Sequence, residues 1–144
     1  MSDIAAEIAI RDLVARYIDA VNRHHQDDWA ATWSENAHWD LAGMEVTGRD
    51  AIVGLWVGAM STFEFALMML NSGTVKVDGN TATGRWYVTE HLKPGEGDPS
   101  LTLGVYDDEY ALEDGEWRFT KRTYHIMYTG AADYSGTFNA YRPG

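Results

Sequence analysis

The segment YIDAVNRHHQDDW, residues 17–29, combines a tyrosine, an asparagine, two adjacent histidines and two adjacent aspartates. A metal site is the first interpretation to consider, because His24 and Asp28 are four residues apart and would share a helix face. A zinc or iron site needs three or four converging ligands, however, and His25 has no comparable partner upstream. We therefore expect these histidines and aspartates to form a solvated helix end that holds no metal ion.

Two other kinds of catalytic chemistry find no support in the sequence. The chain has no cysteine, which excludes a thiolate nucleophile, and no G-x-S-x-G turn of a serine hydrolase. The glycines of GEGDPS, residues 95–100, lie between two expected strands, so they open no helix that could bind a phosphate or a dinucleotide. We expect no cofactor, and acid–base chemistry remains.

Acid–base candidates lie on three segments whose side chains alternate between two faces. One set of faces carries Trp86, Val88 and Glu90 in 81–92, Tyr106 and Asp108 in 101–112, and Arg122 and Tyr124 in 117–129. The opposite faces are also mixed, with Tyr87, Thr89 and His91 in 81–92 and Thr123, His125 and Met127 in 117–129. Periodicity alone does not say which face lines a pocket. Glu90 could be a solvated carboxylate, and Asp108 with Arg122 could be a structural ion pair across neighbouring strands.

Helical elements are expected in the first half of the chain. Apolar residues recur with helical spacing at Ile10, Leu13, Val14, Tyr17, Ile18 and Val21, and the same face continues to Asn22 and His25. A short second helix is expected to follow, capped by Asp27 or Asp28, with Trp29 and Trp33 facing inward. The segment 48–60 predicts a third helix, capped by Asp50.

Strands are expected mainly in the second half. Residues 37–48 predict a short strand pair with a turn near Gly43, and residues 74–92 predict a hairpin with its turn at 78–80. A second hairpin is expected over 101–129, followed by a loop over 130–144. Helices followed by long antiparallel strands favour an α+β fold, with the sheet curved around the helices.

Composition limits the possible partners. The 144 residues, 45 % of them hydrophobic, suit one globular domain over 1–144. Twenty-two acidic against 11 basic residues give a net charge of −11, which argues against nucleic acid and anionic membranes. No stretch is long and apolar enough for a membrane span, and MSDIAAEIAI lacks the features of a signal peptide. With no cysteine, a reducing, cytoplasmic location is expected.

These elements resemble a known family. The order of elements, together with IRDLVARYIDAVNRHHQDDWAATWSENAHWDLAG, VDGNTATGRW and GVYDDEYALEDGEWRFTKR, resembles the SnoaL-like family of the nuclear transport factor 2-like superfamily, in the branch of scytalone dehydratase and hexachlorocyclohexane dehydrochlorinase. The resemblance covers nearly the whole chain. It implies a cone-shaped α+β fold with about three N-terminal helices, a deep apolar pocket, a small apolar or aromatic (including polycyclic) ligand, and a homodimer or homotrimer.

The resemblance also implies where catalytic residues would lie. In these lyases an aspartate near the end of the first helix orients a histidine that removes a proton. Laid over this sequence, the two positions fall on Asn22 and, within about two residues, on Met68. Neither an amide nor a thioether can do this chemistry, and STFEFALMMLNSG contains no histidine. We therefore expect the dyad to be missing here.

Other pocket positions do match the family pattern. Tyr17 and Trp39 fall on pocket positions, Arg122 on an arginine that reaches the pocket, and Asp108 on an acidic partner for it. The same overlay turns one face of the sheet inward: Trp86, Val88, Glu90, Thr102, Gly104, Tyr106, Tyr124 and Ile126. His91 and His125 then face outward, in a structural or subunit-interface role. A carboxylate at position 90 would be desolvated, with a raised pKa.

Two functions follow from this pattern. The first is a cofactor-independent lyase or isomerase acting on an apolar oxygenated substrate, with Glu90, Tyr17 and Arg122 as catalytic residues. Its substrate-binding residues would be Asn22, Trp39, Met68, Trp86, Val88, Tyr106, Asp108 and Tyr124. The alternative is a non-catalytic ligand-binding protein of the same fold that has lost the dyad; a subunit acting only through oligomerisation is a third, weaker reading.

Overall fold

The chain folds into three helices and six strands in the computed structural model, which describes residues 3–137 and 139. The elements are α1 (Ile4–Arg23), α2 (Gln26–Ala30), β1 (Trp33–Leu41), β2 (Met44–Thr47), α3 (Arg49–Met60), β3 (Phe63–Asp78), β4 (Thr81–Pro94), β5 (Ser100–Glu113) and β6 (Glu116–Ala131). This arrangement confirms the expected α+β class. None of the described helices is long and apolar enough to cross a membrane.

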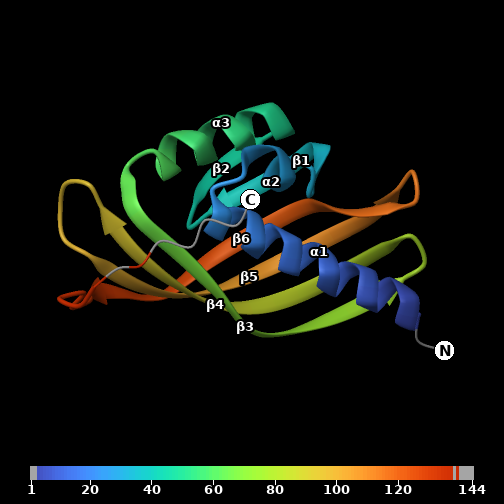
Figure 1. Ribbon diagram of the computed structural model, residues 1–144. Helices are drawn as coiled ribbons and strands as arrows, with labels where there is room; N and C mark the ends of the chain where they lie inside the picture. Colours follow the sequence, from blue (N-terminus) through green and yellow to red (C-terminus); the bar gives the residue numbers. More distant parts are fainter. Residues whose placement is uncertain (1–2, 138, 140–144) are drawn as a thin grey trace.

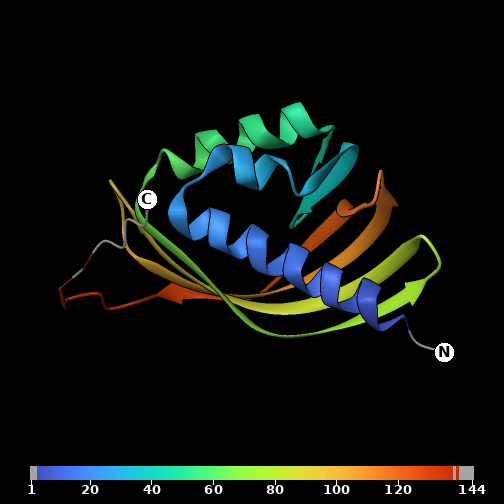
Figure 2. The same ribbon diagram turned by 45° about the vertical axis from the view of Figure 1, so that its right-hand side comes forward.

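The strands form one sheet in the order β2-β1-β6-β5-β4-β3. Neighbouring strands are antiparallel except β1 and β6, which are parallel and bring Trp39 beside Arg122 and Leu41 beside Tyr124. The long strands curve beneath α1, and α3 lies above it (Figures 1 and 2). The concave side of the sheet therefore encloses the core, and the parallel pair closes one side of it.

Helix α1 has the buried face that its periodicity predicts. Asp3 caps it by accepting a hydrogen bond from the backbone N–H of Ala6 at 3.0 Å. The residues predicted for the apolar face are all buried: Ile10, Leu13, Val14, Tyr17, Ile18 and Val21. The helix ends at His24, which adopts the left-handed conformation with φ of 54°.

The caps expected for the other two helices are wrong. His25 precedes α2, and its Nδ1 accepts the backbone N–H of Asp28 at 3.2 Å. Gly48 precedes α3 with φ of 93°, and no side chain caps that helix. A histidine ring can thus replace a carboxylate as acceptor, and a glycine can supply the backbone turn without one.

Strand β3 begins well before residue 74, where the first long strand was expected. Its first half, FEFALMML, is apolar on both faces apart from Glu64, so it lacks the alternation by which a half-buried strand is recognised. The strand lies at the edge of the sheet, where α1 packs along it. This segment forms one wall of the cavity described next.

Candidate active site

A cavity of about 180 Å³ lies between the C-terminal parts of α1 and α3 and the concave face of the sheet. Its lining is mostly apolar, and the ionisable groups are one carboxylate and three phenols. The lining residues are Tyr17, Val21, Trp39, Leu41, Trp56, Ala59, Met60, Phe63, Ala66, Leu67, Met68, Glu90, Leu92, Tyr106 and Tyr124. An enclosed apolar hollow with a few converging polar groups is the usual form of a small-molecule site.

Stacked aromatic rings hold α3 over this cavity. The indoles of Trp29 in α2 and Trp56 in α3 stack with ring centroids 4.6 Å apart and planes 10° from parallel. Trp29 also contacts Trp39 of β1 at 5.4 Å. These contacts hold the last turns of α3 in place. Trp56, Ala59 and Met60 lie there at helical spacings of three and four residues, so all three face the cavity.

Glu90 of β4 is the one carboxylate in the lining. Its backbone pairs with Met68 of the edge strand β3 and with Thr102 of β5. Tyr124 of β6 donates a hydrogen bond from its hydroxyl to Glu90 Oε2 at 2.9 Å. Burial raises the pKa of Glu90, and the hydrogen bond from Tyr124 partly opposes this. A carboxyl whose pKa moves toward neutrality suits a general base or acid.

A glycine allows Tyr124 to reach Glu90 across the intervening strand. Gly104 of β5 lies opposite Ile126 of β6 and Val88 of β4, between the strands that carry the two partners. A Cβ added at Gly104 would come closer than 3.0 Å to three atoms of the Tyr124 side chain. The phenol therefore lies flat over Gly104, which any larger residue would prevent.

Two further phenols lie beside this pair. The hydroxyls of Tyr17 and Tyr106 are 3.5 Å apart, and the Tyr106 and Tyr124 rings lie 4.5 Å apart. Burial raises the pKa of Tyr17 and of Tyr106, while Arg122 opposes the shift at both. Both phenols are therefore protonated hydrogen-bond donors at neutral pH.

Arg122 and Asp108 form a buried ion pair behind the phenols. Arg122 donates to Asp108 through Nε at 2.7 Å and Nη2 at 3.2 Å, and neither side chain is exposed. Burial raises the pKa of Asp108, and the Arg122 charge opposes this. The guanidinium carbon lies 4.4 Å from the Tyr17 ring centre and 3.7 Å from that of Tyr106. Neither charged residue lines the cavity.

Asn22 lies at the position matched to the family's aspartate. It forms hydrogen bonds with Met68, which lies at the position matched to the family's histidine. Its amide donates to the carbonyl of Met68 at 2.9 Å and accepts the backbone N–H of Met68 at 2.8 Å. These bonds occupy the polar groups of Met68 that face away from β4, at the free edge of the sheet. The Met68 side chain lines the cavity, whereas Asn22 does not.

Trp86 and Val88 lie in the core beside the cavity. Both are nearly inaccessible to solvent, and the indole of Trp86 donates to the Tyr110 hydroxyl at 2.8 Å. That hydroxyl in turn donates to Asp108 at 2.6 Å. These residues support the buried ion pair and lie outside the cavity lining.

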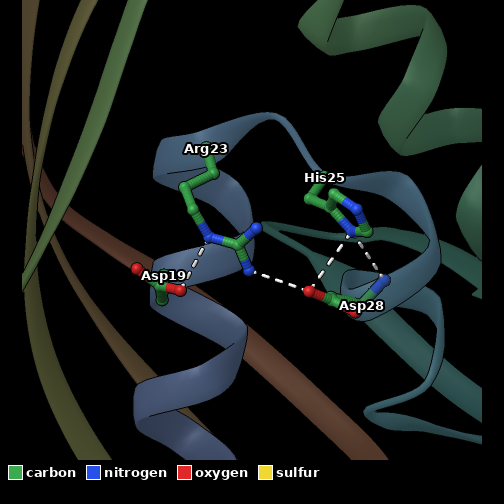
Figure 3. A network of polar contacts seen from close by, with 4 residues as sticks. All are labelled: Asp19, Arg23, His25 and Asp28. Carbon is green, nitrogen blue, oxygen red and sulfur yellow. Dashed lines mark hydrogen bonds and ion pairs between the residues drawn. The ribbon is translucent and has the colours of Figure 1, made fainter. Parts of the chain in front are cut away.

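The end of α1 is solvent-exposed and carries a small polar network (Figure 3). Arg23 bonds Asp19 and Asp28 at 2.8 Å each, and His25 Nδ1 lies 3.3 Å from Asp28. The hydrogen bond from Arg23 lowers the pKa of Asp28. No group of three or more potential metal ligands occurs among the described residues.

The opposite face of the sheet carries the remaining predicted residues. His91 Nδ1 lies 3.0 Å from the Tyr134 hydroxyl, and His125 lies 3.3 Å from Asp107 on the exposed surface. A more open hollow of about 500 Å³ lies here, and its lining is mostly polar and charged. Its basic residues, Lys76, Arg85 and Lys121, equal its acidic residues, Asp107, Asp108 and Glu109, in number, so the lining carries no net charge.

Six predicted site residues meet at the cavity, and five do not. Those that meet are Tyr17, Trp39, Met68, Glu90, Tyr106 and Tyr124; those elsewhere are Asn22, Trp86, Val88, Asp108 and Arg122. Ile126, expected to point inward, is 47 % exposed, because β1 ends beside Tyr124 and leaves the next part of β6 uncovered. Sequence reasoning missed the contribution of α3 and the start of β3, although the helical spacing of Trp56 and Met60 was a usable signal.

Comparison with known proteins gives relatives of the same fold. The gamma-hexachlorocyclohexane dehydrochlorinase of Sphingobium indicum is 27 % identical over 140 residues, which span 85 % of this chain and 83 % of the enzyme. An uncharacterized Mycobacterium tuberculosis protein is 25 % identical over 126 residues, spanning 85 % of this chain and 86 % of the relative.

Solved structures give the same result. A type 3 hexachlorocyclohexane dehydrochlorinase from Novosphingobium barchaimii has a TM-score of 0.83 at 21 % identity, covering 98 % of this chain and 97 % of that one. A protein of Novosphingobium aromaticivorans, named as a candidate scytalone dehydratase, has a TM-score of 0.83 at 22 % identity, covering 98 % and 94 %. The nuclear transport factor 2-like fold is therefore confirmed. Because the SnoaL-like domain matches residues 2–123, most of the chain, this protein belongs to the SnoaL-like family.

Proposed function

We propose that this protein is a small-molecule enzyme that transfers protons by acid–base catalysis, as a cofactor-independent lyase or isomerase. The observation that carries the proposal is Glu90, a desolvated carboxyl with a raised pKa in the wall of an apolar cavity. Relatives named dehydrochlorinase and dehydratase support the same general class, since both names describe eliminations.

Each polar group of the cavity has a role in this proposal. Glu90 removes a proton from carbon and returns it to another position or to solvent. Tyr17 and Tyr106 stabilise the oxyanion that develops, because they are protonated donors in an apolar surrounding. Tyr124 holds the Glu90 carboxylate, and Arg122 supports the Tyr17 and Tyr106 rings from behind.

The reaction differs from that of a dyad enzyme in its base. No histidine lines the cavity among the residues that the structure describes, and Asn22 is bonded to the Met68 backbone. We therefore expect no chloride release from γ-hexachlorocyclohexane, the compound named in one relative. Chloride release that survives Glu90→Gln would identify a different base and overturn the assignment of Glu90.

The experiment that tests this proposal is hydrogen–deuterium exchange at carbon. Cyclohexanone is incubated with the protein in deuterium oxide, and loss of the proton signal beside the carbonyl is followed by NMR. We expect exchange above the buffer rate, rising with pH as Glu90 ionises. Glu90→Gln should reduce it to the buffer rate.

The matched control is Glu109→Gln. Glu109 is an exposed carboxylate of β5 on the opposite face of the sheet, so this variant makes the same chemical change outside the cavity. It should exchange protons at the wild-type rate. Equal exchange by wild type and Glu90→Gln would contradict the proposal, as would a loss of exchange in Glu109→Gln.

A second candidate function is ligand binding without catalysis. The apolar Met68 at the position matched to the family's histidine favours it. In that case Glu90 and the phenols only orient the polar end of a ligand. Saturable binding of cyclohexanone without proton exchange at any pH would decide for this alternative.

A further inference from the structure

We infer that the ligand of the cavity is a neutral compound with one ring and a carbonyl oxygen, and not a polycyclic or anionic one. This inference deepens the proposed function, because it names the substrate class for the same site. It rests on the size of the cavity, the charge of its lining and the direction of its free hydrogen-bonding groups.

The size of the cavity admits one ring. Its volume is about 180 Å³, and an apolar cavity of about 150 Å³ is known to hold one benzene molecule. A six-membered ring with a few substituent atoms fits this space. A second fused ring does not fit while Trp56 and Met60 close the α3 side of the cavity.

The charge of the lining favours a neutral ligand. Among the residues that the structure describes, no lysine, arginine or histidine lines the cavity, and Glu90 adds a negative charge when it ionises. The nearest buried cation on the sheet, Arg122, is already paired with Asp108. A ligand carboxylate would lose its hydration without gaining a cationic partner, and would meet Glu90 as a like charge.

Apart from Glu90, the free polar groups of the lining are donors. Tyr124 gives its hydroxyl proton to Glu90. Tyr17 and Tyr106 face each other at 3.5 Å, so that contact uses one of their two hydroxyl protons and leaves the other for a ligand. The buried indole N–H of Trp39 has no hydrogen-bond partner among the described residues. Because that N–H has no accessible surface, the donor open to a ligand is the remaining phenol proton. A carbonyl oxygen, which accepts hydrogen bonds, matches this donor.

The test is a binding series read by tryptophan fluorescence, because Trp39 and Trp56 line the cavity. The probes are 2-cyclohexen-1-one, the fused two-ring ketone 1-decalone, cyclohexanecarboxylate and the oxygen-free cyclohexene. We expect 2-cyclohexen-1-one to bind at least about tenfold more tightly than each of the other three. Equal binding of 1-decalone or the carboxylate would overturn the inference.

Variants separate size from hydrogen bonding. Met60→Ala should improve 1-decalone binding about tenfold by enlarging the cavity, whereas Met69→Ala, on the exposed face of β3, should change nothing. Tyr17→Phe should weaken the ketone about tenfold and leave cyclohexene unaffected. Improvement of 1-decalone binding by both methionine variants, or equal effects of Tyr17→Phe on ketone and cyclohexene, would contradict the assignment.

The binding series and the exchange experiment fail separately. If 2-cyclohexen-1-one is selected but no proton exchange occurs, the ligand class holds and the catalytic proposal fails. If exchange depends on Glu90 but 1-decalone or the carboxylate binds equally well, the catalytic proposal holds and the ligand class fails.

Discussion

Gly104→Ala should raise the pKa of Glu90, although it changes neither residue of the hydrogen bond between Tyr124 and Glu90. The added Cβ would overlap the Tyr124 ring, and carbon atoms in contact stay about 3.5–4.0 Å apart, so the ring must withdraw by about 1 Å. The Tyr124 hydroxyl lies 2.9 Å from Glu90, and a hydrogen bond from a hydroxyl normally spans about 2.5–3.0 Å. The substitution therefore breaks this bond.

The size of the effect follows from the bond that is lost. A hydrogen bond to an ionised carboxylate contributes about 1.5–3 kcal/mol, and 1.36 kcal/mol corresponds to a tenfold change in an ionisation constant. Without Tyr124, the ionised form of Glu90 loses this support and burial raises its pKa further. Gly104→Ala should lower the ionisation constant of Glu90 by about tenfold to a hundredfold.

The assay is a pH titration of the side-chain carboxyl carbons by ¹³C NMR, with the Glu90 signal assigned by its absence in Glu90→Gln. The pH dependence of proton exchange should shift to higher pH by the amount that corresponds to this change in the ionisation constant of Glu90. Gly54→Ala is the matched control, because a Cβ at that position in α3 reaches open space. It should leave the Glu90 titration unchanged.

A double variant decides whether Tyr124 carries the effect. In a Tyr124→Phe background the hydroxyl is already absent, so Gly104→Ala should change the Glu90 titration no further. An unchanged Glu90 titration in Gly104→Ala alone would refute the reasoning. So would an equally large change in the Tyr124→Phe background, which would mean that the glycine acts through the packing of the sheet.

Three further predictions concern stability, measured by urea unfolding. Burial raises the pKa of Glu90, so the folded protein binds more protons than the unfolded chain between the ordinary and the raised pKa, and wild-type stability falls as pH rises through that window. Glu90→Gln should reduce this fall to the part that Asp108 contributes, because burial raises the pKa of Asp108 as well; an identical pH profile would contradict it. Asp108→Ala leaves the buried Arg122 charge unpaired and should lower the free energy of unfolding by about 3–5 kcal/mol; a cost below 1 kcal/mol would show that the pair is not buried in solution. Asn22→Asp removes the donor to the Met68 carbonyl and should cost about 1–3 kcal/mol at neutral pH, whereas unchanged stability would mean that water replaces it.

Local patterns predicted the parts of this fold that have one buried face. The apolar spacing of α1 placed Tyr17 on its buried face, and the alternation in 81–92 and 101–112 assigned Glu90 and Tyr106 each to one face of its strand. These predictions succeed because a half-buried helix or strand must show its period in the sequence. The family resemblance then chose between the two faces of each strand.

Long-range contacts explain what local patterns missed. The parallel pairing of β1 with β6 joins residues that are far apart in the chain, and nothing in residues 33–41 encodes it. Arg122 lies outside the cavity because it pairs with Asp108 and packs against the rings of Tyr17 and Tyr106. Such a position is decided by which neighbours the sheet supplies, and a single strand sequence does not specify them.

The bond pair between Asn22 and Met68 also affects how the protein behaves in a concentrated solution. β3 is a long edge strand, and an unpaired edge can recruit a strand from another molecule, which leads to aggregation. Asn22 occupies both outward backbone groups of Met68 within this edge, as a neighbouring strand would. The helix end therefore terminates the sheet by imitating its next strand, so that no second chain can add there.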